Sequence, residues 1–591
     1  MGPLWLGLDL STQSLSVAVL SNESMTPLSI SSINFQDHLP HYATSNGMHI
    51  DGDAVTSPVR MWLDAVDIAL MKLKETEKGG SQAPTHLGGC YPALKYYPYF
   101  FLSVSGQQHG TVYWAAGAEE KLKGLASKGP RTTLNEALWP CWARLDCPIW
   151  ADSSTVAQCH ALEEAMGGAA HVAKATGSSA YPRFSGNQIC RLSVEEPEMF
   201  AGCERISLVS SFVTSLLIGK YASIDTSDGS GMNLMDLNEK KWHAQAVKAC
   251  SGNGDAPALL QRLGPLSDPT EIAGELSAFF HSKYGLPVGC PVVVGTGDNP
   301  SSLAATIAFT SSPESTAGIH AVLVTANLLP FQCAMLARTF PHHNSCTTQV
   351  SLGTSDTIIG LTGLPVPQPV GHIMVNPVDP DQYFAMLVYK NGSLIRKRLR
   401  DLYCEGSWDK FELCLKSTQP GNGGKLGLFL DLAEITPQLE RTGDYFCNAD
   451  GEALEESSLT GSEKVRALVE GRFLSMRARL QQMGIPPPSR LIAVGGGSAS
   501  RGILQVLADV FGADVYTFAV PDAAAVGAAL RAKHGVLSHQ AGKPLPYSNV
   551  LLGVDCSENT PKLAVTANKQ HQATYEGLLG PYHSLEEGLK A

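Results

Sequence analysis

The sequence predicts an α/β fold with more than one domain. Three observations lead to this prediction: the chain has 591 residues, apolar strands end in glycine-rich turns, and helices with one apolar face follow such turns. Hydrophobic residues make up 44% and charged residues 17% of the chain, which fits a globular protein with large cores. Because ligands of alternating α/β folds bind at strand ends, site residues are expected in the turns.

Two elements are expected near the N-terminus. "LWLGLDL" and the alternating residues after "STQS" predict a hairpin over residues 4–20. A helix is predicted over residues 57–74, with Ser57 as its N-cap and Pro58 at its first position. The face of this helix expected to be buried consists of Val59, Trp62, Leu63, Val66, Leu70 and Leu73.

The α/β alternation is plainest near the C-terminus. "RLIAVGGG" (490–497) predicts a strand that ends in a glycine turn, and "RGILQVLADVFG" (501–512) predicts a helix. "DVYTF" (514–518) predicts a short strand, and a helix of small residues is expected to follow Asp522 and to pack closely on a sheet. The inner face of the 501–512 helix is expected to contain Ile503, Leu504, Leu507, Val510 and Phe511.

Three predicted strands end in turns of small residues: "GLDLSTQS" (7–14), "VSLGTSDT" (350–357) and "AVGGGSAS" (493–500). The backbone N–H groups of such turns can bind anions, although a tight turn alone also explains any single one. The first two combine Ser and Thr with an acid in different halves of the chain. They therefore indicate a duplicated domain that holds phosphate between its copies, and neither has the lysine of a Walker loop.

A fourth strand end, "VVVGTGDNPSSLAA" (292–305), places Asp298 between Gly297 and Asn299. A lone carboxylate at the edge of a core is costly, so this acid is expected to have a partner or a chemical task. The glycines are expected to let the backbone turn sharply and to let a ligand approach the acid.

Three further motifs carry polar side chains. "SGQQHG" (105–110) and "YPRFSGNQ" (181–188) offer donors suited to a polyhydroxylated ligand, although a capped turn and a surface arginine would also explain them. "SIDTSDGSGMNLMDL" (223–237) predicts only a hairpin.

Composition excludes several classes of protein. The net charge of −12 argues against a general nucleic-acid or anionic-membrane binder. The 14 cysteines are scattered without a CxxC pair, which predicts a reduced, cytoplasmic chain without a zinc site or disulfide framework. No signal peptide is expected, and the polar residues within the apolar stretch 319–337 make a membrane span improbable.

Taken in order, these motifs resemble the eukaryotic xylulokinases, a group within the FGGY carbohydrate kinases. The resemblance also rests on "CPIWADSST", "GHIMVNPVDP", "EGSWDKF" and "VRALVEGRF", and it covers about residues 4–535; "VYKNGSLIRKRLRD" and "KLGLFLD" favour plant-type members. It implies two actin-like, ribonuclease-H-like ATPase domains around a central cleft. It also implies ATP- and Mg²⁺-dependent phosphorylation of D-xylulose to D-xylulose 5-phosphate, which feeds the pentose phosphate pathway.

The resemblance implies roles for individual residues. Asp298 matches the catalytic base that accepts the proton of the sugar's 5-hydroxyl, and Asp9 matches the acid that positions magnesium through water. The substrate-binding positions are matched by His109, Arg183, Asp298 and Asn299. The nucleotide-binding positions are matched by Asp9, Thr12, Gln13, Gly353, Thr354, Trp408, Gly496, Gly497 and Ser500.

The sequence departs from the family at several places. Val104 replaces a usual glycine, Ala151 a usual methionine and Ser500 a usual asparagine, which puts the nucleotide contact of Ser500 in doubt. Residues 78–101 and 306–348 are longer than their family counterparts. Each segment is explained either by an insertion in a surface loop or by untranslated sequence retained in the gene model.

The predicted organisation is an N-terminal FGGY domain over residues 1–303, a C-terminal FGGY domain over 304–545 and a peripheral tail over 546–591. The expected partners are D-xylulose and ATP, with no nucleic acid or membrane, and the sequence does not indicate an oligomeric state. Two alternatives stay open. The chain could be a kinase for another ketose or polyol, or a catalytically impaired sugar- or nucleotide-binding homologue because of its two atypical segments.

Overall fold

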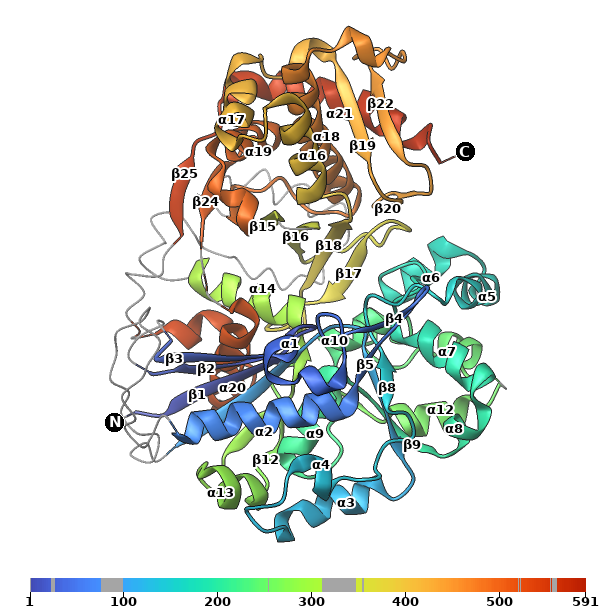
Figure 1. The fold of residues 1–591 in the computed structure, drawn as a ribbon, viewed down its shortest axis with the longest axis vertical. Helices are drawn as coiled ribbons and strands as arrows, with labels where there is room; N and C mark the ends of the chain where they lie inside the picture. The colour runs from blue at the N-terminus through green and yellow to red at the C-terminus, as the bar shows by residue number, and fades with distance from the viewer. Residues whose placement is uncertain are drawn as a thin grey trace. The chain divides into compact units, whose positions relative to one another are not determined.

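The computed structural model of the chain separates into two compact units, and Figure 1 labels most of their elements. Unit 1 comprises Met1–Phe309, Met374–Asp381 and Val520–Asn559, and unit 2 comprises Thr310–Ile373, Gln382–Ala519 and Thr560–Ala591. The chain therefore returns to unit 1 twice after it has entered unit 2. The structure describes residues 2–22, 27–75, 99–252, 254–310, 347–352, 355–518, 520, 522–552, 554 and 561–590.

The main sheet of unit 1 has the strand order β12-β13-β6-β1-β2-β3, with β14 also paired to β6. β1, β2 and β3 are antiparallel neighbours, β6 and β13 continue in parallel from β1, and β12 is antiparallel to β13. The hairpin predicted over residues 4–20 is confirmed. The bounds are β1 Leu4–Leu10, β2 Ser14–Leu20, β3 Ser29–Asn34, β6 Phe100–Gly106, β12 Ile272–Glu275, β13 Pro291–Val293 and β14 Thr296–Gly297.

Helix α20 (Ala523–Ala541) packs directly on β1 and β6. A Cβ atom on Gly7 would lie 1.8 Å from the carbonyl oxygen of Ala525, and one on Gly527 would lie 1.8 Å from that of Ser301. Gly7 therefore permits the contact of the helix with β1, and Gly527 permits its close approach to the backbone at Ser301. The predicted close packing of this helix on a sheet is confirmed, but the sheet belongs to unit 1 and is built mainly from the start of the chain.

Helix α2 (Val59–Glu75) packs on β2 and β3, and all six residues of its predicted inner face are buried. Its predicted N-cap is wrong. Ser57 and Pro58 end strand β5 (Ala54–Pro58), and the Ser57 hydroxyl donates to the carbonyl of Gly47 at 2.7 Å. The backbone N–H of Val59, the first residue of the helix, instead donates to the carbonyl of Leu145.

The other longer helices of unit 1 pack on its strands and on one another. α9 packs on β6, and a Cβ on Gly106 would lie 2.7 Å from the backbone nitrogen of Ser210 in α9. These helices are α3 Ala118–Gly124, α5 Val156–Met166, α6 Ala169–Thr176, α7 Ser185–Glu195, α8 Pro197–Ala201, α9 Val209–Ile218, α11 Ala244–Cys250, α12 Ala256–Leu263, α13 Ala278–Tyr284 and α14 Asp298–Thr310.

Unit 2 repeats the strand pairing of unit 1. Its sheet has the order β17-β18-β16-β15-β23-β24-β25, in which β18, β16 and β15 are antiparallel, β23 and β24 continue in parallel, and β25 is antiparallel again. From β18 to β25 this is the pattern of β3 to β12, which confirms the duplicated domain. The bounds are β15 Thr347–Leu352, β16 Asp356–Thr362, β17 His372–Val375, β18 Tyr383–Tyr389, β23 Arg490–Val494, β24 Asp514–Thr517 and β25 Lys562–Val565.

The helices of unit 2 follow the expected alternation. The strand predicted from residue 490, the helix predicted over 501–512 and the strand predicted over 514–518 are confirmed as β23, α19 and β24, and the predicted inner face of α19 is buried. The five helices are α16 Ser393–Tyr403, α17 Trp408–Ser417, α18 Gly461–Gln482, α19 Arg501–Phe511 and α21 Gln572–Glu587 among the described residues.

The C-terminal residues 561–590 differ from the peripheral tail that the sequence predicts. β25 adds an edge strand to the unit 2 sheet, and α21 packs on α18 and α19. Tyr575, Leu578 and Tyr582 of α21 are buried, and Glu586 forms a buried ion pair with Arg479 of α18. A polar stretch therefore contributes an apolar helix face to the core.

The two atypical segments predicted over 78–101 and 306–348 lie mostly outside the described residues, as does the apolar stretch 319–337. Their described ends belong to regular elements: residues 100–101 open β6, and residues 306–310 complete α14. In the part of the chain that is described, no helix combines the length and the apolarity that crossing a membrane requires.

Candidate active site

Asp298 begins helix α14 directly after the short strand β14. The flanking glycines do not provide the sharp turn that the sequence predicts, because neither has a positive φ. They provide space. A Cβ on Gly297 would lie 2.4 Å from Cγ of Gln108 and 2.8 Å from Oδ1 of Asp228, and one on Gly295 would lie 2.7 Å from Oγ1 of Thr214.

The Asp298 carboxylate is held by one oxygen. Oδ1 accepts hydrogen bonds from the backbone N–H of Asn299 at 2.8 Å, from the side-chain amide of Asn299 at 3.3 Å and from the backbone N–H of Gln108 at 3.4 Å. All three bonds go to Oδ1 and none goes to Oδ2. Burial raises the pKa of Asp298 to about 7, and the negative charge of Asp9 adds to the shift. Such a carboxyl can gain and lose a proton near neutral pH.

Asp9 lies near the end of β1, in register with Ser105 of β6. The hydroxyl of Ser11 donates to its Oδ2, whereas its buried Oδ1 has no hydrogen-bond partner within the described residues. Burial raises the pKa of Asp9, and the charge of Asp522 adds to the rise, while the hydroxyls of Ser105 and Ser11 oppose it. A buried oxygen without a partner indicates room for a water or an ion.

Two more acids join this site, and the sequence interpretation missed both. Residues 223–237 form no hairpin: Asp225 caps the short helix α10 (Thr226–Gly229), and Asp228 lies within it. Burial raises the pKa of Asp228 to about 8, and the charges of Asp225 and Asp298 add to the rise. The available signal was two acids among Ser and Gly with no basic residue nearby in sequence. We call the following residues the acid cluster: Asp9, Asp225, Asp228 and Asp298.

Arg531 of α20 connects this cluster to the sheet. Its guanidinium is fully buried and donates to the carbonyls of Val294 at 3.1 Å and Pro269 at 2.9 Å, and it lies 3.8 Å from the Asp225 carboxylate. Burial still raises the pKa of Asp225. Because Arg531 binds the carbonyl of the residue that precedes the Gly295–Asp298 segment, it helps to fix the position of Asp298.

His109 and Arg183 lie together around one aromatic side chain. The His109 ring stacks on Phe184 with centroids 4.5 Å apart, and the Arg183 guanidinium lies 5.2 Å from the ring centroid of Tyr181 and 5.7 Å from that of Phe184. Nδ1–H of His109 donates to the Gly231 carbonyl at 2.8 Å. Burial lowers the pKa of His109 to about 3, and the positive charge of Arg183 contributes to this lowering. The imidazole is therefore neutral, and its Nε2 can accept a hydrogen bond.

The β1–β2 turn carries Thr12 and Gln13. Oγ1 of Thr12 accepts the indole N–H of Trp150 at 2.8 Å, and Gln13 is exposed. Of the departures from the family, Val104 is fully buried in β6, and an ideal Cβ on Gly295 would lie 3.1 Å from its Cβ. The valine therefore occupies space that Gly295 leaves open.

In unit 2 the predicted nucleotide glycines follow strand β23. Gly495 has a φ of +83°, and a Cβ there would lie 2.9 Å from the carbonyl oxygen of Leu352. A Cβ on Gly497 would lie 2.7 Å from Cβ of Leu352, whereas a Cβ on Gly496 would meet no described atom within 4 Å. Gly495 and Gly497 are thus required by the backbone, and the space beside Gly496 is open to a ligand.

Ser500 and Trp408 meet through helix α17. The Ser500 hydroxyl caps α19 and also donates to Glu412 of α17, whose carboxylate accepts the Gly502 N–H at 2.8 Å. The hydroxyl is thus already engaged within the protein. Trp408 is the first residue of α17, is 46% exposed, and has the Arg400 guanidinium 4.8 Å from its ring centroid.

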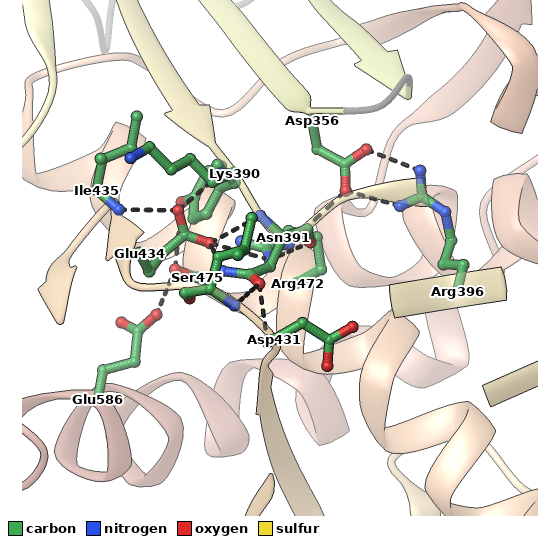
Figure 2. Close-up of polar contacts among 12 residues, drawn as sticks. Asp356, Lys390, Asn391, Arg396, Asp431, Glu434, Ile435, Arg472, Ser475 and Glu586 are labelled. Atoms are coloured by element: carbon green, nitrogen blue, oxygen red, sulfur yellow. Dashed lines mark hydrogen bonds and ion pairs between the residues drawn. The ribbon is translucent and has the colours of Figure 1, made fainter. Parts of the chain in front are cut away.

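The second phosphate turn is described only at its ends, because Gly353 and Thr354 lie outside the described residues. The acid of this turn, Asp356, is the first residue of β16 and is fully buried. Arg396 of α16 donates two parallel hydrogen bonds to its carboxylate (Figure 2). These bonds measure 2.7 and 2.9 Å, and Arg472 lies 3.7 Å from the same carboxylate.

The same arginine continues the network. Arg472 donates to the carbonyl of Asn391 at 2.7 Å and pairs with Glu434 at 3.4 Å (Figure 2). Glu434 also accepts the backbone N–H groups of Lys390 at 2.7 Å and Ile435 at 2.9 Å. We call the following residues the Asp356 network: Asp356, Asn391, Arg396, Glu434 and Arg472. Every acid in it has a cation or several donors, as expected of a structural assembly.

Comparison with known families decides where the chain belongs. Residues 145–305 match the N-terminal domain, and residues 348–536 the C-terminal domain, of the FGGY family of carbohydrate kinases. The chain belongs to the FGGY family of carbohydrate kinases. The predicted resemblance to this family is confirmed.

Individual relatives of this FGGY kinase cover almost its whole length. It is 40% identical to the xylulose kinase of Rattus norvegicus over 99% of this chain and 96% of that protein, and 39% identical to xylulose kinase 2 of Arabidopsis thaliana over 98% and 95%. The crystal structure of xylulose kinase from Rhodospirillum rubrum is 17% identical, with a TM-score of 0.71 and 99% of each chain covered. That likeness confirms the predicted two-domain actin-like, α/β fold.

ATP use follows from membership of this family of carbohydrate kinases, and Mg²⁺ is the metal typical of it. The described residues contain no group of three or more His, Cys, Asp or Glu side chains placed to hold a metal ion. Protein-bound Mg²⁺ commonly uses one or two carboxylates and completes its coordination with water and substrate phosphates. The unpartnered Oδ1 of Asp9 is suited to such a site.

Proposed function

We propose that this FGGY kinase transfers the γ-phosphate of ATP to the 5-hydroxyl of D-xylulose and produces D-xylulose 5-phosphate and ADP. The observation that carries this proposal is the 40% identity to rat xylulose kinase, which extends over 99% of this chain and 96% of that protein. A shared fold alone would not select the sugar, because many functions are built on one fold.

We assign the general base to Asp298. The 5-hydroxyl gives its proton to this carboxylate as its oxygen attacks the γ-phosphorus, and the bond from that phosphorus to the leaving ADP oxygen breaks. The assignment is supported by Oδ1 being held by Asn299 and Gln108, and by a pKa raised to about 7 by burial and by Asp9. A base with a pKa near the working pH combines the correct protonation state with sufficient basicity.

We assign magnesium binding to Asp9 in this proposal. An uncompensated acid cluster would repel a triphosphate, so the phosphates need a counter-charge. Asp9 would hold a Mg²⁺ ion through a water molecule, and the ion would supply this counter-charge to the phosphate oxygens. The Ser11 hydroxyl on Oδ2 orients the Asp9 carboxylate and leaves Oδ1 for the bound water.

We assign sugar binding to His109, Arg183 and Asn299. Neutral His109 accepts a sugar hydroxyl at Nε2, because Nδ1–H is committed to the Gly231 carbonyl. Arg183 donates from its place beside Tyr181 and Phe184, and its charge suits hydroxyl or carbonyl oxygens. Asn299 shares its amide with the base, so it ties the sugar position to Asp298.

We assign nucleotide-binding residues in each unit separately. We place the phosphates at Asp9 and the β1–β2 turn and at Gly353 and Thr354, the adenosine at Gly496 and Gly497, and the adenine beside Trp408. Ser500 supports this face through its bond to Glu412. In this proposal the predicted domains 1–303 and 304–545 carry mainly the sugar and the nucleotide. The sites above are Asp9, Thr12, Gln13, Gly353, Thr354, Trp408, Gly496, Gly497 and Ser500.

The test is ADP formation by the purified chain with ATP and Mg²⁺, with and without sugar. D-xylulose, D-ribulose, D-fructose and glycerol are compared by kcat/KM, and D-xylulose is expected to give the highest value. A higher value for another acceptor would replace the sugar assignment. Calorimetric binding of D-xylulose without ADP formation would instead establish an impaired homologue.

A further inference from the structure

Two cysteines of unit 2 lie within reach of each other beside the proposed nucleotide face. Cys404 follows the last residue of α16, Cys414 lies in α17, and their sulfur atoms are 3.7 Å apart. Cys404 is buried, whereas Cys414 is partly exposed. The Ser462 hydroxyl donates to Sγ of Cys414 at 3.3 Å. The ten cysteines within the described residues are all free thiols.

The chain between the two thiols forms a short, constrained connection. Glu405 has a φ of +50° and Gly406 a φ of +72°, so α16 and α17 are joined by a tight left-handed turn. A disulfide bond is about 2.05 Å long, so the two sulfurs need to approach by roughly 1.7 Å. Side-chain rotation with a small helix shift can supply this movement.

We propose that Cys404 and Cys414 form a reversible disulfide when the chain meets a low-molecular-weight disulfide, and that this bond weakens ATP binding. The first half of the proposal rests only on the two thiols. The second half rests on the proposed function of Trp408 and its neighbours.

The exchange is balanced in two steps. Cys414, the accessible thiol, loses its proton, and its sulfur attacks one sulfur of the small disulfide, whose S–S bond breaks to release one thiol. Cys404 then loses its proton and attacks Sγ of Cys414, which releases the second thiol and closes the protein disulfide. Two electrons pass from the protein to the oxidant. Burial and the neighbouring Cys414 raise the pKa of Cys404 to about 12, which assigns Cys404 the second, slower step.

The bond would act on the nucleotide face through α17. This helix carries Trp408 at its start and Glu412, whose carboxylate binds Ser500 and the N–H of Gly502 at the start of α19. Arg400 of α16 also contacts the Trp408 ring. A bond between Cys404 and Cys414 would shift α17 relative to α16. This shift would disturb the Arg400–Trp408 contact between these two helices and the contacts of Glu412 with the start of α19.

The chemical test uses the full chain with oxidised and reduced glutathione in varied ratios. After alkylation and digestion, mass spectrometry is expected to find peptides containing Cys404 and Cys414 joined, two hydrogen atoms lighter than the free pair, and restored by dithiothreitol. Glutathione stably attached to Cys414 without a Cys404 bond, or two free thiols at every ratio, would overturn the proposal. Because this readout requires no turnover, it is independent of the proposed function.

The functional test compares the wild type with Cys414→Ser, and uses Cys447→Ser, a buried thiol elsewhere in unit 2, as the matched control. Oxidation is expected to raise KM for ATP about fivefold or more in the wild type and in Cys447→Ser, and not in Cys414→Ser. Cys404→Ser should match Cys414→Ser if it folds. Equal loss of ATP affinity in Cys414→Ser would assign the effect to another group and refute the regulatory role.

Discussion

Two members of the acid cluster of unit 1, Asp228 and Asp298, and the acids of the Asp356 network of unit 2 lie in opposite surroundings. In the network, Asp356 has two parallel hydrogen bonds to Arg396, and Glu434 has Arg472 and several backbone donors. In the cluster, the pKa values of Asp228 and Asp298 are raised by burial and by neighbouring carboxylates. A buried acid that is fully paired is structural, whereas acids that raise one another's pKa are suited to proton transfer.

The two sheets share one strand pattern, from β3 to β12 in unit 1 and from β18 to β25 in unit 2. β1 and β2 correspond to β15 and β16, yet the acids occupy different strands. Asp9 lies on the strand that enters the turn, whereas Asp356 opens the strand that leaves it. The two turns therefore look alike in sequence but place their acids differently, and we expect only Asp9 to face a ligand.

The largest expected effect is on catalysis by Asp298→Asn. Asparagine keeps the shape of the side chain but cannot accept the sugar proton, so kcat should fall about 10²- to 10⁴-fold. The melting temperature should not fall, because the variant removes a partly buried charge whose hydrogen-bond donors among the described residues are all neutral. Steady-state kinetics and calorimetry of the same preparation measure both quantities. A kcat within about twofold of the wild type would remove Asp298 from the proposed role.

Asp356→Asn should give the reverse result. Removing this charge leaves the buried Arg396 without its carboxylate partner and leaves Arg472 with Glu434 alone. The free energy of unfolding should therefore fall by about 3–5 kcal/mol. Asp431→Asn is the matched control: Asp431 pairs with Arg398, and both side chains are about one-third exposed. The free energy of unfolding of the control variant should fall by less than about 1 kcal/mol. Denaturant unfolding compares the two, and equal losses would mean that the network is not a structural assembly.

The pH profile of the wild type should also report the cluster. Because the pKa of Asp298 is raised to about 7, the base is protonated in acid. The value of kcat/KM for D-xylulose should therefore fall about tenfold per pH unit below pH 7. A profile that stays flat down to pH 5 would show that no group with this pKa is the base.

Much of the fold could be predicted from the sequence because its signals are local. The hairpin 4–20, the α2 face and the β23–α19–β24 series all follow from periodicity and glycine turns. The sheet on which α20 packs could not be predicted from the sequence. Its small residues specify a close contact, but only the tertiary structure shows that the partner strand is β1, through Gly7. Ser57 was misassigned for the same reason, since a tertiary carbonyl, that of Leu145, satisfies the N–H of Val59.

The candidate site was predicted where one motif carries the chemistry, and missed where several segments share it. Asp298 stands out because an apolar strand runs into it. Asp228 lies in a polar segment, so its burial is invisible until α10 is placed against Gly297. The glycines beside Asp298 show the same limit, because their role is to accept Gln108 and Asp228 rather than to turn the chain.

Asp228→Asn tests the cluster through stability. The pKa of Asp228 is about 8 in the folded chain and about 3.9 for an unfolded aspartate. Between these values the folded state holds a proton that the unfolded state has lost, so this residue makes the free energy of unfolding decrease as pH rises. Asparagine cannot titrate, so the variant should flatten that decrease by up to about 1.4 kcal/mol per pH unit between pH 5 and 7. Urea unfolding at several pH values measures the slope, with Asp51→Asn, at an exposed strand position, as the control. An unchanged slope in Asp228→Asn would show that Asp228 is ionised in the folded protein. The neighbouring carboxylates of the acid cluster would then not raise its pKa.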